Sequence, residues 1–159
     1  MNKENKYDYI VKRQLSQDEL NGYHEAYWPK VELLNSRYSP QIDITTSALD
    51  KLEYLDFLRI KWLFDESPDR PPFDFILHGL GFAFGLLFHR KLGMQWCLIE
   101  DRYGEGISLI YSAKDKAKNN GHISFPPFSY VKKRKDVMDG VIFFNGFNRL
   151  AKIINDNGS

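Results

Sequence analysis

The residues best suited to chemistry lie between positions 78 and 101. Glu100 and Asp101 are adjacent, and His78 and His89 precede them in the chain. Carboxylates and imidazoles could together hold a metal ion or transfer protons. A metal site needs at least three converging ligands, however, and neighbouring residues of a strand point to opposite faces. We therefore expect Asp101 to shape a turn and Glu100 to pair with a basic side chain, and we predict neither a metal nor a cofactor.

Two glycines lie near these histidines on one side of a predicted helix. Gly81 and Gly85 are four residues apart, and helical geometry places His78 and His89 on the same side. A glycine has no side chain, so another element can approach closely there. We expect this face to pack on a sheet. If it instead borders a pocket, the lining residues are His78, Gly81, Gly85, His89, Trp96, Glu100 and Asp101.

The second candidate surface is basic. Residues 111–159 carry 9 basic and 4 acidic side chains, whereas residues 1–110 carry 13 and 17. Such charges can be solvated without a partner, or can contact phosphates. The whole chain has a net charge of only +1, which is small for a nucleic-acid-binding protein. We expect an acidic protein surface as the partner, contacted by Lys114, Lys116, Lys118, Lys132, Lys133, Arg134 and Lys135.

The chain has one cysteine, and its first residues do not resemble a signal segment. Cys97 cannot form a disulfide within the chain, and residues 1–10 are polar and aromatic. We therefore expect a cytoplasmic protein. Cys97 could be a nucleophile, but its place between Trp96 and Leu98 in a predicted strand favours an inert buried thiol.

A long apolar helix must position these groups. Prolines 71 and 72 suit a helix start and Gly93 a helix end, which predicts a helix over residues 73–92. Residues 75–88 contain no charged side chain other than histidine. This stretch is shorter than the ~20 apolar residues that cross a bilayer, so we expect a buried helix and no membrane partner.

Strands follow this helix. Residues 94–100 and 107–111 alternate between apolar and polar, and the glycine-rich residues 101–106 between them predict an antiparallel hairpin with a loop of several residues. Residues 122–125 can supply a third strand before two prolines.

The N-terminal half is predicted to be helical after a polar tail. Residues 1–15 form the tail, apart from a possible short strand at 7–11. Ser16 and Glu19 form a capping box that opens a helix over residues 17–37, with a kink or break near Pro29.

Two further helices are predicted, over residues 48–66 and 141–154. Arg59 lies within the apolar face of the first, where we expect its long stem to reach the rim; alternatively it helps to build a polar pocket. The second has the predicted buried stripe Val141, Phe144, Phe147, Leu150, Ala151 and Ile154.

Length and composition predict one folded unit. The chain has 159 residues, 43% of them hydrophobic, which suffices for one core and is short for two domains. We predict a single α+β domain over residues 16–159, in which N-terminal helices and the central helix pack on a small antiparallel sheet and a helix ends the chain.

Four segments carry a spaced pattern of Gly, Trp, Glu-Asp and Pro: Gly81-Phe-Ala-Phe-Gly85, Leu92-Gly-Met-Gln-Trp96, Ile99-Glu-Asp-Arg-Tyr-Gly104 and Pro127-Phe-Ser-Tyr-Val-Lys-Lys-Arg134. This pattern resembles a bacterial family catalogued as domain of unknown function 3806, over residues 77–135. The resemblance implies a helix-plus-sheet domain and transfers no activity.

Elimination leaves a binding role as the preferred function. No catalytic motif stands out, so we expect a non-enzymatic protein-binding domain, such as an immunity or adaptor protein that neutralises or tethers a partner. Two alternatives stay open. One is a small enzyme with a His/Glu/Asp pocket beside the central helix, and the other is nucleic-acid binding through the basic C-terminal residues.

Overall fold

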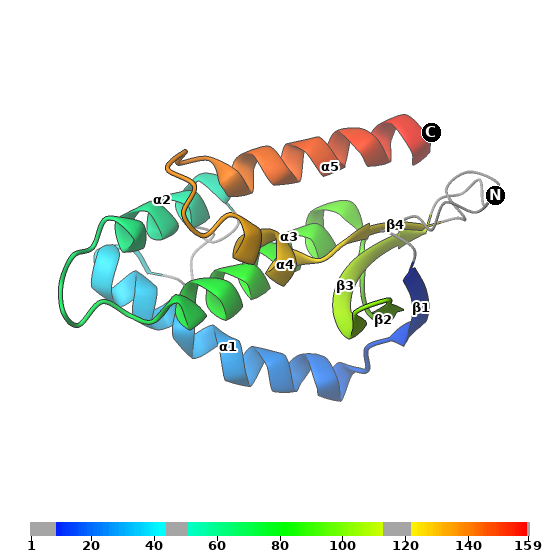
Figure 1. Ribbon diagram of the computed structural model, residues 1–159, viewed down its shortest axis with the longest axis horizontal. Helices are drawn as coiled ribbons and strands as arrows, with labels where there is room; N and C mark the ends of the chain where they lie inside the picture. Colours follow the sequence, from blue (N-terminus) through cyan, green and yellow to red (C-terminus); the bar gives the residue numbers. More distant parts are fainter. Residues whose placement is uncertain (1–8, 44–50, 113–121, 159) are drawn as a thin grey trace.

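A four-stranded antiparallel sheet forms one layer of the protein, and helices cover one of its faces (Figure 1). The computed structural model describes residues 9–43, 51–112 and 122–158. The strands follow one another across the sheet in the order β1-β2-β3-β4. This arrangement confirms the predicted α+β class, with helices between the first and second strands and after the fourth.

The first strand extends the folded domain beyond its predicted start. β1 (Tyr9–Gln14) pairs antiparallel with β2 (Gln95–Asp101), with Tyr9 opposite Asp101 and Gln14 opposite Cys97. The short strand predicted at residues 7–11 is confirmed for residues 9–11, whereas residues 7 and 8 lie outside the described residues. The predicted tail is wrong for residues 12–14, which continue the strand. Backbone pairing to β2 orders this segment although four of its six residues are exposed.

The central hairpin is tighter than predicted. β2 pairs with β3 (Gly104–Ser112), and Asp101 is opposite Gly104, so only two residues form the turn instead of several. Trp96 and Leu98 face the helices, whereas Cys97 and Ile99 belong to a smaller cluster on the other face. This alternation confirms the predicted faces of the strand. β4 (His122–Phe125) adds the predicted third strand beside β3.

The central helix covers the predicted residues but contains a π-helical segment. Residues 73 and 74 are helical, η2 (Phe75–Leu80) is π-helical, and α3 (Gly81–Leu92) continues from it without a break. Gly93 ends α3 with a φ of 68°, the left-handed conformation predicted for it. Phe84, Leu87 and Phe88 of α3 are fully buried at the centre of the core.

The first helix confirms the capping box and disproves the predicted break. α1 spans Gln17–Tyr38, and the Ser16 side chain accepts from the Glu19 backbone while the Glu19 carboxylate accepts from the Ser16 backbone. The helix continues through Pro29. Val31 and Leu34, after the proline, are fully buried, and this packing holds the helix together despite the lost hydrogen bond.

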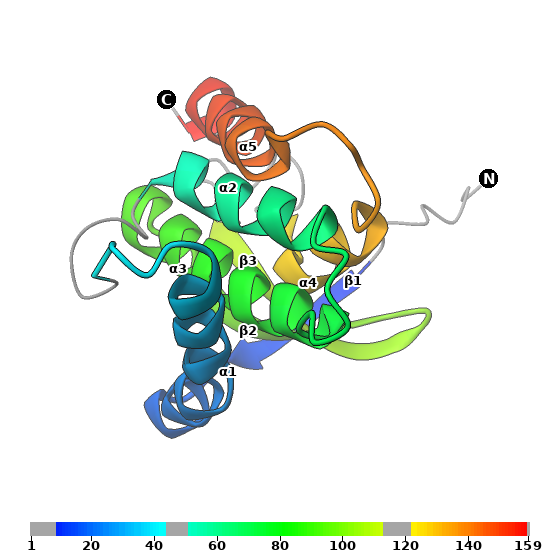
Figure 2. The same cartoon turned by 90° about the vertical axis from the view of Figure 1, so that its left-hand side faces the viewer.

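Of the last two helices, the longer one lies beside α2 (Leu52–Leu63), and the shorter one packs against α3 (Figure 2). α4 spans Pro127–Lys133, and α5 spans Ile142–Gly158. The predicted stripe of α5 was partly wrong, because Phe143 is fully buried whereas Val141 and Phe144 are exposed. The helix begins at residue 142, so its buried face is set by the way its first turn docks on α2.

In the part of the chain that the structure describes, no helix is both long enough and apolar enough to span a membrane.

The packing at Gly85 generates a stability prediction. A Cβ built at Gly85 would lie 2.2 Å from Trp96 Cη2, so Gly85→Ala would overpack the core. We expect the free energy of unfolding to fall by roughly 1–3 kcal/mol. Urea denaturation measures it. The matched control is Gly22→Ala in exposed α1, where a Cβ meets nothing within 4 Å and helix propensity should raise stability by up to about 1 kcal/mol. Equal effects of the two substitutions would contradict this packing.

Candidate functional site

The pocket predicted along the glycine face of the central helix is filled by aromatic side chains. The Trp96 indole packs over Gly85, and the Phe128 ring packs over Gly81, where a Cβ would lie 2.9 Å from Phe128 Cδ1. The glycines are thus packing points, as the sequence indicated. Gly85 packs on the sheet as expected, whereas Gly81 packs on helix α4 instead. Trp96 belongs to the core rather than to a binding site.

The two histidines of that face have separate partners. His78 Nδ1 pairs with Asp74 Oδ1, and the His78 ring stacks on Tyr27. Asp74 also binds Lys30 at 2.7 Å, and this hydrogen bond is the main reason that its pKa is lowered. His89 Nδ1 donates to the Met94 carbonyl at 2.6 Å, next to the helix end. The imidazoles therefore stabilise the helix and do not meet each other.

The two acids have the structural roles that were predicted. Glu100 pairs with Lys12 of β1 at 2.9 Å, and Asp101 accepts from the Tyr103 backbone at 2.8 Å within the turn. Among the described residues, no three His, Cys, Asp or Glu side chains come close enough to hold a metal ion.

The basic residues divide into separate groups. Lys114, Lys116 and Lys118 lie outside the described residues. Lys132 and Lys133 are exposed on α4. Arg134 and Lys135 lie over aromatic rings. Arg134 Cζ is 3.7 Å from the centroid of the Tyr130 ring, and Lys135 Nζ is 4.9 Å from the centroid of the Phe73 ring. Of the four basic residues that the structure describes here, Arg134 lines the groove between α4 and α5.

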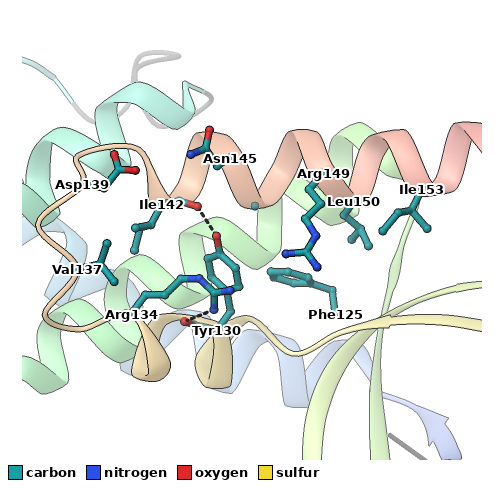
Figure 3. Close-up of a pocket in the computed structure, with 11 residues that line it drawn as sticks. Phe125, Tyr130, Arg134, Val137, Asp139, Ile142, Asn145, Arg149, Leu150 and Ile153 are labelled. Atoms are coloured by element: carbon teal, nitrogen blue, oxygen red, sulfur yellow. Dashed lines mark hydrogen bonds between the residues drawn. The ribbon is translucent and has the colours of Figure 1, made fainter.

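This groove of about 450 Å³ lies between α4, the loop of residues 134–141 and α5 (Figure 3). Two arginines line it, one from each side: Arg134 follows α4, and Arg149 extends from α5 toward Phe125. Its apolar lining includes Phe125, Ile142, Leu150 and Ile153. Guanidinium groups above an apolar surface form a site suited to a ligand in which an anionic group lies next to apolar groups.

Close packing of α4 on α5 shapes the groove. Tyr130 of α4 donates to the Ile142 carbonyl at 2.5 Å, and a Cβ at Gly146 would lie 2.4 Å from the Tyr130 hydroxyl oxygen. Only a glycine admits the phenol there. Arg134 Nη1 also donates to the Tyr130 carbonyl at 3.3 Å, which orients the guanidinium along the groove.

Sequence reasoning missed the α5 side of this groove. Ile142, Asn145, Arg149 and Ile153 recur at spacings of three and four, so they share one helix face, and all four line the groove. That spacing can be seen in the sequence. The spacing does not predict that this face of α5 lies opposite α4.

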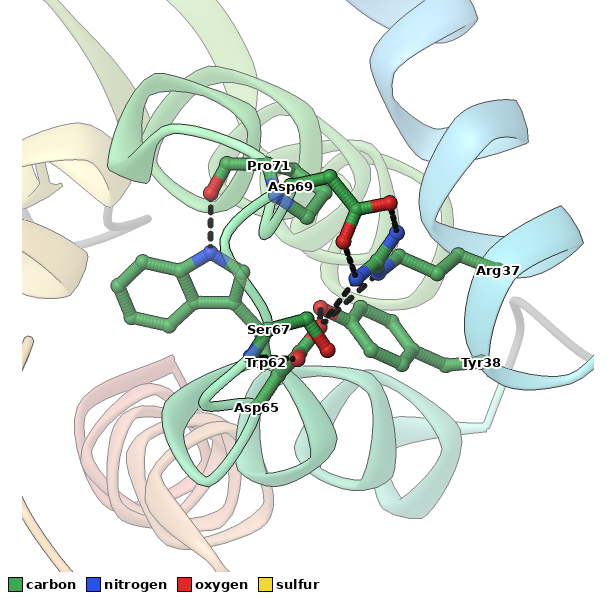
Figure 4. Close-up of polar contacts among 7 residues, drawn as sticks. All are labelled: Arg37, Tyr38, Trp62, Asp65, Ser67, Asp69 and Pro71. Atoms are coloured by element: carbon green, nitrogen blue, oxygen red, sulfur yellow. Dashed lines mark hydrogen bonds and ion pairs between the residues drawn. The ribbon is translucent and has the colours of Figure 1, made fainter.

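The groove arginines differ from the arginine cluster around Arg37. Neither Arg134 nor Arg149 makes an ion pair with a carboxylate of a described residue, whereas Arg37 binds both Asp65 at 2.9 Å and Asp69 at 3.0 Å (Figure 4). Tyr38 donates to the same Asp65 carboxylate, which has a lowered pKa. The Arg37 cluster is neutralised within the fold and anchors the loop after α2. The Arg134 and Arg149 guanidinium groups are not neutralised in this way and can bind an anionic group of a ligand.

Two buried polar residues of α2 position the groove wall. Arg59 is fully buried and donates to the carbonyls of Val137 and Asp139 at 2.9 and 2.5 Å. The expectation that its stem reaches the rim was wrong, because the loop after α4 passes over the guanidinium. Asp56, only 3% exposed, accepts from the backbone N–H groups of Phe143 and Phe144. Asp56 thus caps α5 from a different helix.

Comparison with known proteins adds no relative. No protein-family model, no curated protein and no solved structure matches the chain. The resemblance to domain of unknown function 3806 therefore stays a prediction.

Asp56 generates a prediction about pH. Burial outweighs its two backbone hydrogen bonds and raises its pKa from 3.8 to about 6. The folded state then binds this proton more tightly than the unfolded chain, so the contribution to stability is fully present below about pH 4 and is lost as the pH rises through 6. Relative to Asp56→Asn, the native protein should gain roughly 1–3 kcal/mol of unfolding free energy between pH 7 and 4. Urea denaturation at each pH measures this difference. A difference that is constant with pH would contradict it.

Proposed function

We propose that this domain is a non-enzymatic binding protein whose α4–α5 face captures an acidic surface of another protein. The observation that carries the proposal is the pair of groove arginines, which have no carboxylate partner among the described residues and lie over apolar side chains. Arginine of this kind is enriched at protein interfaces and binds carboxylates through two parallel hydrogen bonds.

The surface around the groove supports the same proposal. Exposed apolar side chains border it in the loop and in the first turn of α5: Val137, Met138, Val141 and Phe144 are 37%, 66%, 40% and 39% exposed. Lys132 and Lys133 add charge on α4. An apolar patch next to unpaired cations is typical of a surface that another protein covers.

A partner bound in this way would be neutralised or tethered, as an immunity or adaptor protein does. We place this role in the cytoplasm, where a reducing environment suits a chain whose one cysteine is buried. Electrostatic attraction should speed the association and weaken with salt.

Charge reversal on α4 tests the proposal. Lys133→Glu combined with Arg134→Glu should abolish capture of the partner, because the two introduced carboxylates would repel the acidic surface of the partner. The melting temperature should fall only modestly, because Lys133 is exposed and Arg134, which is half-buried, loses its stacking on Tyr130 and one long hydrogen bond. A pull-down followed by reconstitution with the purified, identified partner measures the loss.

The matched control is Lys91→Glu combined with Lys152→Glu, which changes the net charge equally at exposed positions outside the groove. Capture that falls equally in both pairs would contradict a specific α4–α5 interface. Tight, sequence-tolerant binding to RNA or DNA in a gel shift, lost only in the α4 pair, would favour the nucleic-acid alternative instead.

A further inference from the structure

We propose that the α4–α5 groove selects an acidic side chain that has apolar residues on both sides within an extended segment of the partner. This inference rests on the proposed function, since it names what the same surface recognises. It follows from the order of charged and apolar side chains along α5.

The positive charge lies in the middle of the groove. Arg134 and Arg149 approach it from opposite walls, and the Arg134 guanidinium is held against Tyr130 by stacking and by its bond to the Tyr130 carbonyl. Such a guanidinium is already oriented, so less conformational entropy is lost when it binds a carboxylate.

Apolar side chains continue on both sides of the arginines. Along α5, Ile153 lies four residues beyond Arg149, or about 6 Å, and Ile142 lies seven residues before it, or about 10 Å. In an extended segment, at about 3.3 Å per residue, side chains on the same face are two or four residues apart, or about 7 and 13 Å. The nearest match is therefore an apolar residue two positions from the acid on one side and four positions from it on the other. The apolar lining therefore fits an acid inside a segment better than a carboxylate at a chain end.

One acid of the groove itself strengthens this placement. Asp139 lines the end near Ile142, where its carboxylate accepts from the Val141 backbone at 3.1 Å. A second carboxylate at that end would be repelled by it. The bound acid is accordingly expected between the arginines.

Capped peptides provide the probe. We would titrate ¹⁵N-labelled protein with acetyl-Ser-Leu-Ser-Ser-Ser-Glu-Ser-Leu-Ser-amide, with its reverse-order counterpart and with the matching Gln peptides, and follow the arginine Nε–H signals by NMR. One of the two Glu peptides should shift the Arg134 and Arg149 signals saturably. Its Gln counterpart should bind with an affinity at least about tenfold lower, because a charge-assisted hydrogen bond is lost.

Two variants of α5 locate the interaction. Arg149→Gln should weaken binding of the Glu peptide to the level of the Gln peptide, whereas Lys152→Gln, exposed on the same helix outside the groove lining, should leave it unchanged.

The proposal would be overturned by several outcomes: no saturable binding of either Glu peptide, equal binding of Glu and Gln peptides, displacement by inorganic phosphate, or preference for a Gln peptide with a free terminal carboxylate. If these occur while the α4 charge-reversal pair still abolishes capture of the purified partner, the interface stands and only its selectivity for a segment is wrong. If capture also survives charge reversal, the proposed function fails as well.

Discussion

The arrangement of the helical layer depends on two buried polar side chains of one helix. Asp56 and Arg59 of α2 reach the start of α5 and the loop before it, through four hydrogen bonds to backbone groups. Burying such groups is costly unless they are satisfied, so few alternative positions of this loop are compatible with a folded α2. The loop and α5 in turn form one wall of the groove.

The opposite wall belongs to the aromatic core. Phe84 and Phe88 of α3 contact Phe125 at the end of β4, and Phe125 contacts Tyr130 of α4. The groove floor is therefore continuous with the most deeply buried part of the protein. Arg13 on the surface, in contrast, is neutralised locally by Glu19. Arg134 and Arg149 bring two guanidinium groups that have no carboxylate partner among the described residues to one groove with a rigid floor, which is why we assign function to this face.

Sequence reasoning predicted those features that depend on local chemistry. The capping box at Ser16, the helix end at Gly93 and the alternation around Trp96 follow from neighbouring residues, and the structure confirms all three. Arg59 could not be placed in this way, because its acceptors lie 78 and 80 residues later in the chain. The groove itself was missed for the same reason: α4 and α5 each showed half of it, and only tertiary packing brings the halves together.

Hydrogen exchange in an Arg59→Met variant tests the central claim, that the buried polar residues of α2 hold the groove wall in place. Methionine fills a similar volume but cannot donate to the carbonyls of Val137 and Asp139. Mass spectrometry should detect faster amide exchange in residues 134–145, while residues 95–112 of the central hairpin stay as protected as in the native protein. Unchanged exchange in residues 134–145, or an equal increase throughout the chain, would contradict the claim.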